Sequence, residues 1–97
     1  MSKDMLNQLF ESGVVAVVRR IDEDKVMKVI SSLIEGGVLG IEVTLDSPNA
    51  LQVIHEAKKE FGSKAGIGAG TVLDAESAIA SIKAGAEFIV APTLNEN

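Results

Sequence analysis

Four short apolar runs recur along the chain at intervals of 23 to 26 residues, and a segment with helical periodicity follows each of the first three. The runs begin at Val14, Leu39, Ala65 and Phe88. The first run, Val14–Val18, is almost wholly β-branched and contains no polar residue, which is typical of a strand buried on both faces of a parallel sheet. Strands and helices that alternate in this way form right-handed βα units. The repeat therefore predicts an α/β fold with a parallel sheet.

We expect one partial domain over residues 1–97, with strands near 14–19, 39–45, 65–68 and 88–91. A leading helix is expected over residues 3–12. Ser47 and Pro48 have the pattern of a helix cap followed by proline at the first helical position. In the helix before the fourth strand, the residues expected to face inward are Ala75, Ala78, Ile79 and Ile82.

The composition argues against several classes of function. The chain has no cysteine, so disulfides and thiolate chemistry are excluded. The single histidine, His55, is expected on a solvated helix face, and a lone histidine makes no metal site. The net charge of −5 argues against binding to nucleic acid or to an anionic membrane. With no signal-peptide run and no stretch of transmembrane length, these features favour a cytoplasmic protein, and we expect neither metal nor cofactor.

Glu42 is the one acidic residue inside an otherwise apolar run, Ile41–Leu45. A buried carboxylate must be paired, protonated or functional, because burying it without a partner costs several kcal/mol. Strand alternation places Glu42 and Thr44 on the face opposite Ile41 and Val43. The sequence leaves two interpretations open, a functional acid that faces a barrel interior and a structural glutamate paired with Arg19 or Arg20.

Arg19 and Arg20 follow the first strand, at the end of a parallel sheet where α/β barrels carry their active sites. Alternation with Val15 and Val17 favours Arg19 as the inward-pointing residue of the two. An arginine there can hold a carboxylate through two parallel hydrogen bonds. The alternative is a surface salt bridge to Asp22 or Asp46.

Residues 66–71 contain three glycines and resemble a nucleotide-binding loop at first sight. The G-x-G-x-x-G pattern needs glycine at the position of Thr71, so the pattern fails. Glycines at the end of a strand also allow the backbone to approach a ligand closely. The segment is therefore better explained by close packing at a ligand site than by dinucleotide binding.

Several segments, taken in order and with their spacing, resemble the first half of the bacterial 2-keto-3-deoxy-6-phosphogluconate (KDPG) and 4-hydroxy-2-oxoglutarate (KHG) aldolases. The segments are Val15–Arg19, Glu35–Gly37, Ile41–Leu45, Gly68–Leu73 and Ala84–Pro92. Each is weakly specific alone, but their order covers essentially the whole chain. The resemblance implies a class I aldolase, in which a lysine forms a Schiff base with the keto carbon, a glutamate moves protons and pyruvate is released.

The same resemblance implies roles for individual residues. Glu42 corresponds to the proton-shuttling glutamate, Thr71 to a ligand of the pyruvyl carboxylate, and Pro92 to a wall of the pocket. Some relatives carry the carboxylate-binding arginine just after the second strand, where this chain has Asp46. Other relatives carry it at the end of the first strand, so the role falls to Arg19.

The Schiff-base lysine of this family lies on the sixth strand, whereas this chain reaches only the fourth, so the lysine is expected to be absent. The expected fold is the N-terminal half of a TIM-type (β/α)8 barrel, and a flavodoxin-like open sheet is the alternative. The expected function is that of an aldolase half acting on a keto acid, and the alternative is a non-catalytic half-barrel that serves as an assembly module. Apolar strands at both edges of an open sheet also predict a homo-oligomer.

Overall fold

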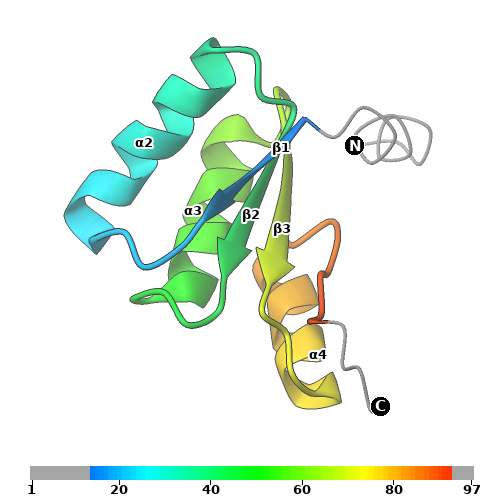
Figure 1. Cartoon of the computed structure of the whole chain (residues 1–97). Helices are drawn as coiled ribbons and strands as arrows, with labels where there is room; N and C mark the ends of the chain where they lie inside the picture. Colours follow the sequence, from blue (N-terminus) through cyan, green and yellow to red (C-terminus); the bar gives the residue numbers. More distant parts are fainter. Residues whose placement is uncertain (1–13, 93–97) are drawn as a thin grey trace.

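The computed structural model describes residues 14–92 and contains three βα units (Figure 1). Its elements, in chain order, are β1 (Val15–Val18), α2 (Glu23–Glu35), β2 (Gly40–Thr44), α3 (Ala50–Phe61), β3 (Gly66–Gly70) and α4 (Ala75–Ala84). The three strands lie at the predicted positions. The helix expected over residues 3–12 lies outside the described residues.

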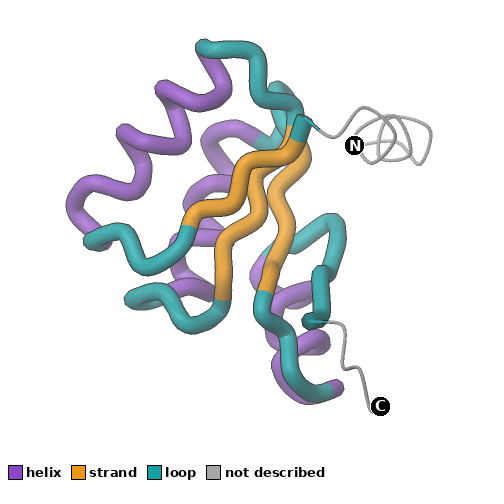
Figure 2. The backbone as a smooth tube through the Cα atoms, in the orientation of Figure 1, coloured by secondary structure: helices purple, strands orange, loops and turns teal. Residues whose placement is uncertain are grey.

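The three strands are parallel and follow one another in chain order, β1-β2-β3 (Figure 2). A flavodoxin-like sheet would place the first strand between the second and the third. The flavodoxin-like alternative is therefore wrong. The register aligns Val17 with Glu42 and Glu42 with Gly68, so these residues form one row across the sheet.

The fourth predicted strand, residues 88–91, is reduced to a single bridge between Ile89 and Ala69 of β3. The peptide N–H of Ala69 donates to Phe88 O at 3.0 Å, and that of Val90 donates to Ala69 O at 2.8 Å. This is the pairing of a parallel ladder, so the segment lies beside β3 as expected, but it is too short to be a strand. Pro92 closes it and has no N–H with which to extend the ladder.

The core lies on one face of the sheet, between the strands and the helices. Ile41, Val43 and Ile67 are fully buried there against residues of the helices such as Ile30 and Ile54. Figure 1 shows α2 and α3 on the same side of the sheet. The other face carries the row that contains Glu42, and Val17 in that row is 56% exposed. Glu42 therefore does not point into the layer of helices.

The predicted inward stripe of α4 is wrong at three of its four positions, and only Ala78 is partly buried. Ala75 is exposed, Ile79 and Ile82 are 54% and 59% exposed, and Ser81 is fully buried instead. The Ser81 hydroxyl donates to Ser77 O at 2.8 Å within the helix, so burying it leaves no unpaired polar group. The helix packs through small residues, which hydrophobic periodicity alone does not detect.

Candidate active site

The candidate site is built from three turns that follow the carboxyl ends of β1, β2 and β3. Arg19 follows β1, Asp46 belongs to the turn after β2, and Thr71 follows β3. Because parallel strands end at the same edge of a sheet, residues far apart in sequence meet there. This is the edge at which α/β proteins bind their ligands.

Arg19 and Thr71, the two residues expected to bind a carboxylate, are in direct contact. Arg19 Nη2 donates to Thr71 Oγ1 at 3.1 Å, across 52 positions of sequence. Thr71 has a φ of 56°, in the left-handed region that costs a β-branched residue energy. Strained backbone of this kind concentrates at ligand sites. The contact places a guanidinium and a hydroxyl where both can reach one carboxylate.

Arg20 has a different set of partners. Its Nε donates to Asp46 Oδ2 at 3.0 Å, and its Nη2 lies 2.9 Å from the same oxygen. Arg19 Nη1 lies farther from that oxygen, at 3.8 Å. The predicted salt bridge between Arg19 and Asp46 is therefore present, but it is longer than the one between Arg20 and Asp46. Arg19, rather than Arg20, is the arginine that reaches Thr71.

Glu42 lies half-buried on the open face of the sheet. Within residues 14–92, no hydrogen bond or ion pair joins its carboxylate to either arginine, so the interpretation as a paired structural glutamate is wrong. Burial raises the pKa of the Glu42 carboxyl above its ordinary value, and the positive charge of Arg19 opposes that rise. A carboxyl with a raised pKa and no fixed partner among these residues holds a proton more readily than an ordinary glutamate, which is a property of groups that transfer protons.

The glycines of β3 make room for two side chains on this open face. A Cβ at Gly70 would overlap the Glu42 carboxylate, and a Cβ at Gly68 would overlap the ring of Phe88. The sequence indicated close packing here, but it did not identify these two side chains. The sequence signal that could have identified them is the presence of Gly68 and Gly70 in a strand whose neighbouring segments carry bulky residues.

Ser47 does not cap α3 as predicted. The residue at the cap is Asn49, and Ser47 Oγ instead accepts the peptide N–H of Arg20 at 2.7 Å. Ser47 Oγ also lies 2.9 Å from Thr44 Oγ1, which is fully buried. The turn after β2 is thus tied to the turn after β1.

Asp46 belongs to the same cluster. A hydrogen bond from Thr44 is the largest cause that lowers the pKa of its carboxyl, and the hydrogen bond and charge of Arg20 and the charge of Arg19 lower it further. Asp46 is therefore a fixed anion beside the two arginines.

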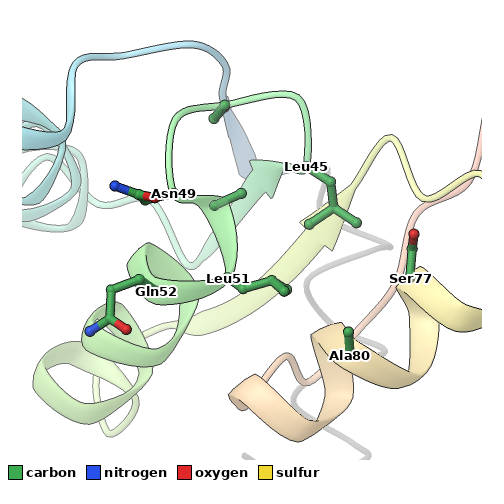
Figure 3. Close-up of a pocket in the computed structure, with 8 residues that line it drawn as sticks. Leu45, Asn49, Leu51, Gln52, Ser77 and Ala80 are labelled. Carbon is green, nitrogen blue, oxygen red and sulfur yellow. The ribbon is translucent and has the colours of Figure 1, made fainter.

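Two hollows lie near the carboxyl ends of the strands. One, of about 280 Å³, is lined by Asp46 and Thr71 together with Leu73 and Asp74. The other, of about 460 Å³, lies between α3 and α4, where Leu51 points toward α4 (Figure 3). No side chain that lines this second hollow is ionisable. The chemistry therefore favours the site at Thr71.

Pro92 is not brought into this cluster. It is exposed and lies at the last described position, beyond the segment that pairs with β3. Its predicted role as a pocket wall stays a prediction.

Residues 14–92 contain no group of three or more histidine, cysteine, aspartate or glutamate residues arranged to hold a metal ion. None of their helices combines the length and apolarity needed to cross a membrane.

The fold is a parallel sheet of βα units that brings an arginine and a threonine together at its carboxyl edge and carries a half-buried glutamate on its open face. Family comparison specifies the class: the KDPG and KHG aldolase model matches residues 5–97, so the chain belongs to the KDPG and KHG aldolase family. The resemblance deduced from the sequence is thereby confirmed.

Individual relatives agree with this assignment. The 2-dehydro-3-deoxy-6-phosphogalactonate aldolase of Escherichia coli (strain K12) is 35% identical over 81 residues, which are 84% of this chain and 40% of the relative. The solved structure "Native KDPGal structure" superposes with a TM-score of 0.78 at 34% identity, over 84% of this chain and 39% of that one. The KDPG aldolase of Legionella pneumophila, solved with pyruvate captured as a covalent carbinolamine intermediate, has a TM-score of 0.76 at 27% identity, with the same coverage. The chain thus spans about 40% of its relatives.

We predict that Gly70→Ala will displace Glu42, because the new methyl group would occupy the space of the carboxylate. Overpacking of this kind costs about 1–3 kcal/mol of unfolding free energy, which chemical denaturation measures. Gly36→Ala is the matched control, since a Cβ there meets only two carbonyl oxygens at 3.5 Å. Equal stability of the two variants would contradict the packing described here.

Proposed function

We propose that this chain supplies part of the active site of a class I aldolase of the KDPG/KHG type. The reaction is the reversible cleavage of a 2-keto-3-deoxy sugar acid, or its phosphate, into pyruvate and an aldehyde. The observation that carries the proposal is the 3.1 Å contact between Arg19 and Thr71 at the carboxyl edge of the sheet, where the charge of Arg19 also acts on Glu42 in the middle of β2.

In the proposed reaction, Arg19 and Thr71 bind the carboxylate of the keto acid. A guanidinium offers two parallel N–H donors to a carboxylate, and the threonine hydroxyl adds a third. The anion then sits beside a fixed positive charge, and its keto carbon is oriented toward the open face of the sheet. Family membership supports these roles, which the resemblance of the sequence assigns to Arg19 and Thr71.

Glu42 acts as the proton carrier. Once a lysine has condensed with the keto carbon, the resulting iminium accepts the electrons of the breaking carbon–carbon bond. Glu42 takes the proton of the hydroxyl group as the aldehyde leaves and then returns it to the enamine carbon. Its raised pKa favours this exchange, because the protonated form that returns the proton is more accessible than in an ordinary glutamate.

The lysine has to come from outside residues 14–92. The described lysines lie on helices or in a turn, at Lys25, Lys28, Lys58, Lys59, Lys64 and Lys83, and none of them lies on a strand. We therefore propose that the full-length product of the gene closes a (β/α)8 barrel and supplies the lysine from a later strand. The 97-residue chain by itself is proposed to be inactive.

The non-catalytic alternative is favoured by one observation, the exposed apolar edge of the sheet at β1. Val17 on this edge strand is 56% exposed, and an open apolar edge strand is a template for association. In this alternative, the 97-residue chain is an assembly module whose copies cover one another as a homo-oligomer.

The two functions are separated by incubation with pyruvate and borohydride, followed by mass spectrometry. The full-length gene product should gain one pyruvyl group, whereas the 97-residue chain should gain none and should elute in light-scattering analysis as an oligomer. Absence of the adduct from the full-length product would refute the aldolase proposal.

In the full-length product, Glu42→Gln should lower kcat by about 10²–10⁴-fold, because an amide cannot accept the hydroxyl proton. The wild-type rate should fall as the pH drops through the pKa of Glu42, at a pH above the ordinary carboxyl range. The variant should lack that limb of its pH profile. Glu60→Gln, an exposed change on α3, is the control, and similar rates for both variants would contradict the assignment.

Arg19→Ala should weaken pyruvate binding by about 1.5–3 kcal/mol, the range for hydrogen bonds to charged groups. Calorimetric titration with pyruvate measures this change. Arg19→Lys should recover only part of the affinity, because an ammonium lacks the planar fork of donors. An unchanged dissociation constant in Arg19→Ala would move the carboxylate site elsewhere.

A further inference from the structure

Two consecutive arginines leave the end of β1 with separate partners. Arg19 reaches across β2 to Thr71, which follows β3, while Arg20 binds Asp46 in the turn after β2. The roles proposed above do not include Arg20. Its contacts suggest one, because they involve the anion that lies nearest to Arg19.

Asp46 competes for Arg19. Its Oδ2 lies 3.8 Å from Arg19 Nη1, within ion-pair distance, but 2.9 Å from Arg20 Nη2. Both Nε and Nη2 of Arg20 approach that single oxygen, so Arg20 carries the shorter and better-directed interaction. Without Arg20, the nearest cation to the Asp46 carboxylate would be Arg19. A guanidinium drawn to Asp46 is not free to bind a ligand carboxylate.

The backbone fixes this division of partners. Arg20 has a φ of 55°, in the left-handed region, and its N–H is held by Ser47 Oγ at 2.7 Å. Ser47 Oγ is in turn 2.9 Å from the Thr44 hydroxyl, which donates to Val18 O at 3.4 Å. The turns after β1 and β2 are thereby tied together, and the backbone of Arg20 is held in place beside Asp46.

We propose that Arg20 is a positioning residue that occupies the Asp46 carboxylate and so keeps Arg19 available, beside Thr71, for the carboxylate of the keto acid. The proposal rests on the proposed function, in which Arg19 binds that carboxylate. Arg20 itself does not touch the substrate. Its effect is electrostatic and acts through Asp46, so removing Asp46 should make Arg20 dispensable.

The test is a double-mutant cycle in the full-length gene product, read by calorimetric titration with pyruvate and by steady-state kinetics. Arg20→Ala should raise the pyruvate dissociation constant and the KM for the keto-acid substrate by roughly tenfold, because carboxylate binding is weakened. It should change kcat little, because proton transfer is not affected. Arg20→Ala combined with Asp46→Asn should return both constants to within about twofold of wild type. Lys59→Ala, which removes a positive charge from the last turn of α3, is the matched control.

A merely structural role for Arg20 predicts a different pattern. The double variant would then bind pyruvate no better than Arg20→Ala, and this result would overturn the proposal. An Arg20→Ala dissociation constant equal to that of Lys59→Ala would overturn it as well. If Arg20→Ala does not fold, Arg20→Gln in the wild-type and Asp46→Asn backgrounds gives the same comparison. Failure of the aldolase proposal is recognised separately, because wild type would then form no pyruvyl adduct.

Discussion

The parallel register of the three strands is the constraint on which the site depends. It aligns Val17, Glu42 and Gly68 in one row and ends all three strands at one edge. Residues that are 52 positions apart, Arg19 and Thr71, consequently meet within hydrogen-bond distance. A shift of one residue in β2 would turn Glu42 into the layer of helices and expose Ile41 or Val43, both buried in the core, so core packing enforces the geometry of the site.

The fold was largely predictable because apolar runs and glycine-terminated helices repeat at regular intervals. The prediction was wrong where small or polar residues replace apolar ones at contacts. In α4, buried Ser81 satisfies its own hydroxyl within the helix, and the apolar Ile79 and Ile82 remain exposed. The fourth strand was overestimated for a different reason, since propensity does not reveal that Pro92 ends the ladder after a single bridge.

The site was predictable where one residue contradicts its surroundings, as Glu42 does within an apolar strand. It was not predictable where function depends on the space between residues. Two features leave no pattern in the sequence. A Cβ at Gly70 would overlap Glu42, and Ser47 holds the backbone of Arg20. These features arise from the spacing of neighbouring strands and from backbone angles, which become defined only once the sheet has formed.

At Thr71, the left-handed backbone lowers stability, whereas the side chain supplies a contact with Arg19. Glycine would adopt a φ of 56° without steric cost, so the backbone conformation alone favours glycine over threonine at position 71. Threonine remains at this position, and its hydroxyl is the group that Arg19 contacts. Selection for thermal tolerance alone would therefore tend to remove the hydroxyl, whereas selection for the contact with Arg19 would tend to retain it. A glycine at this position in a homologue would then mark a sheet that has kept its architecture after losing this contact.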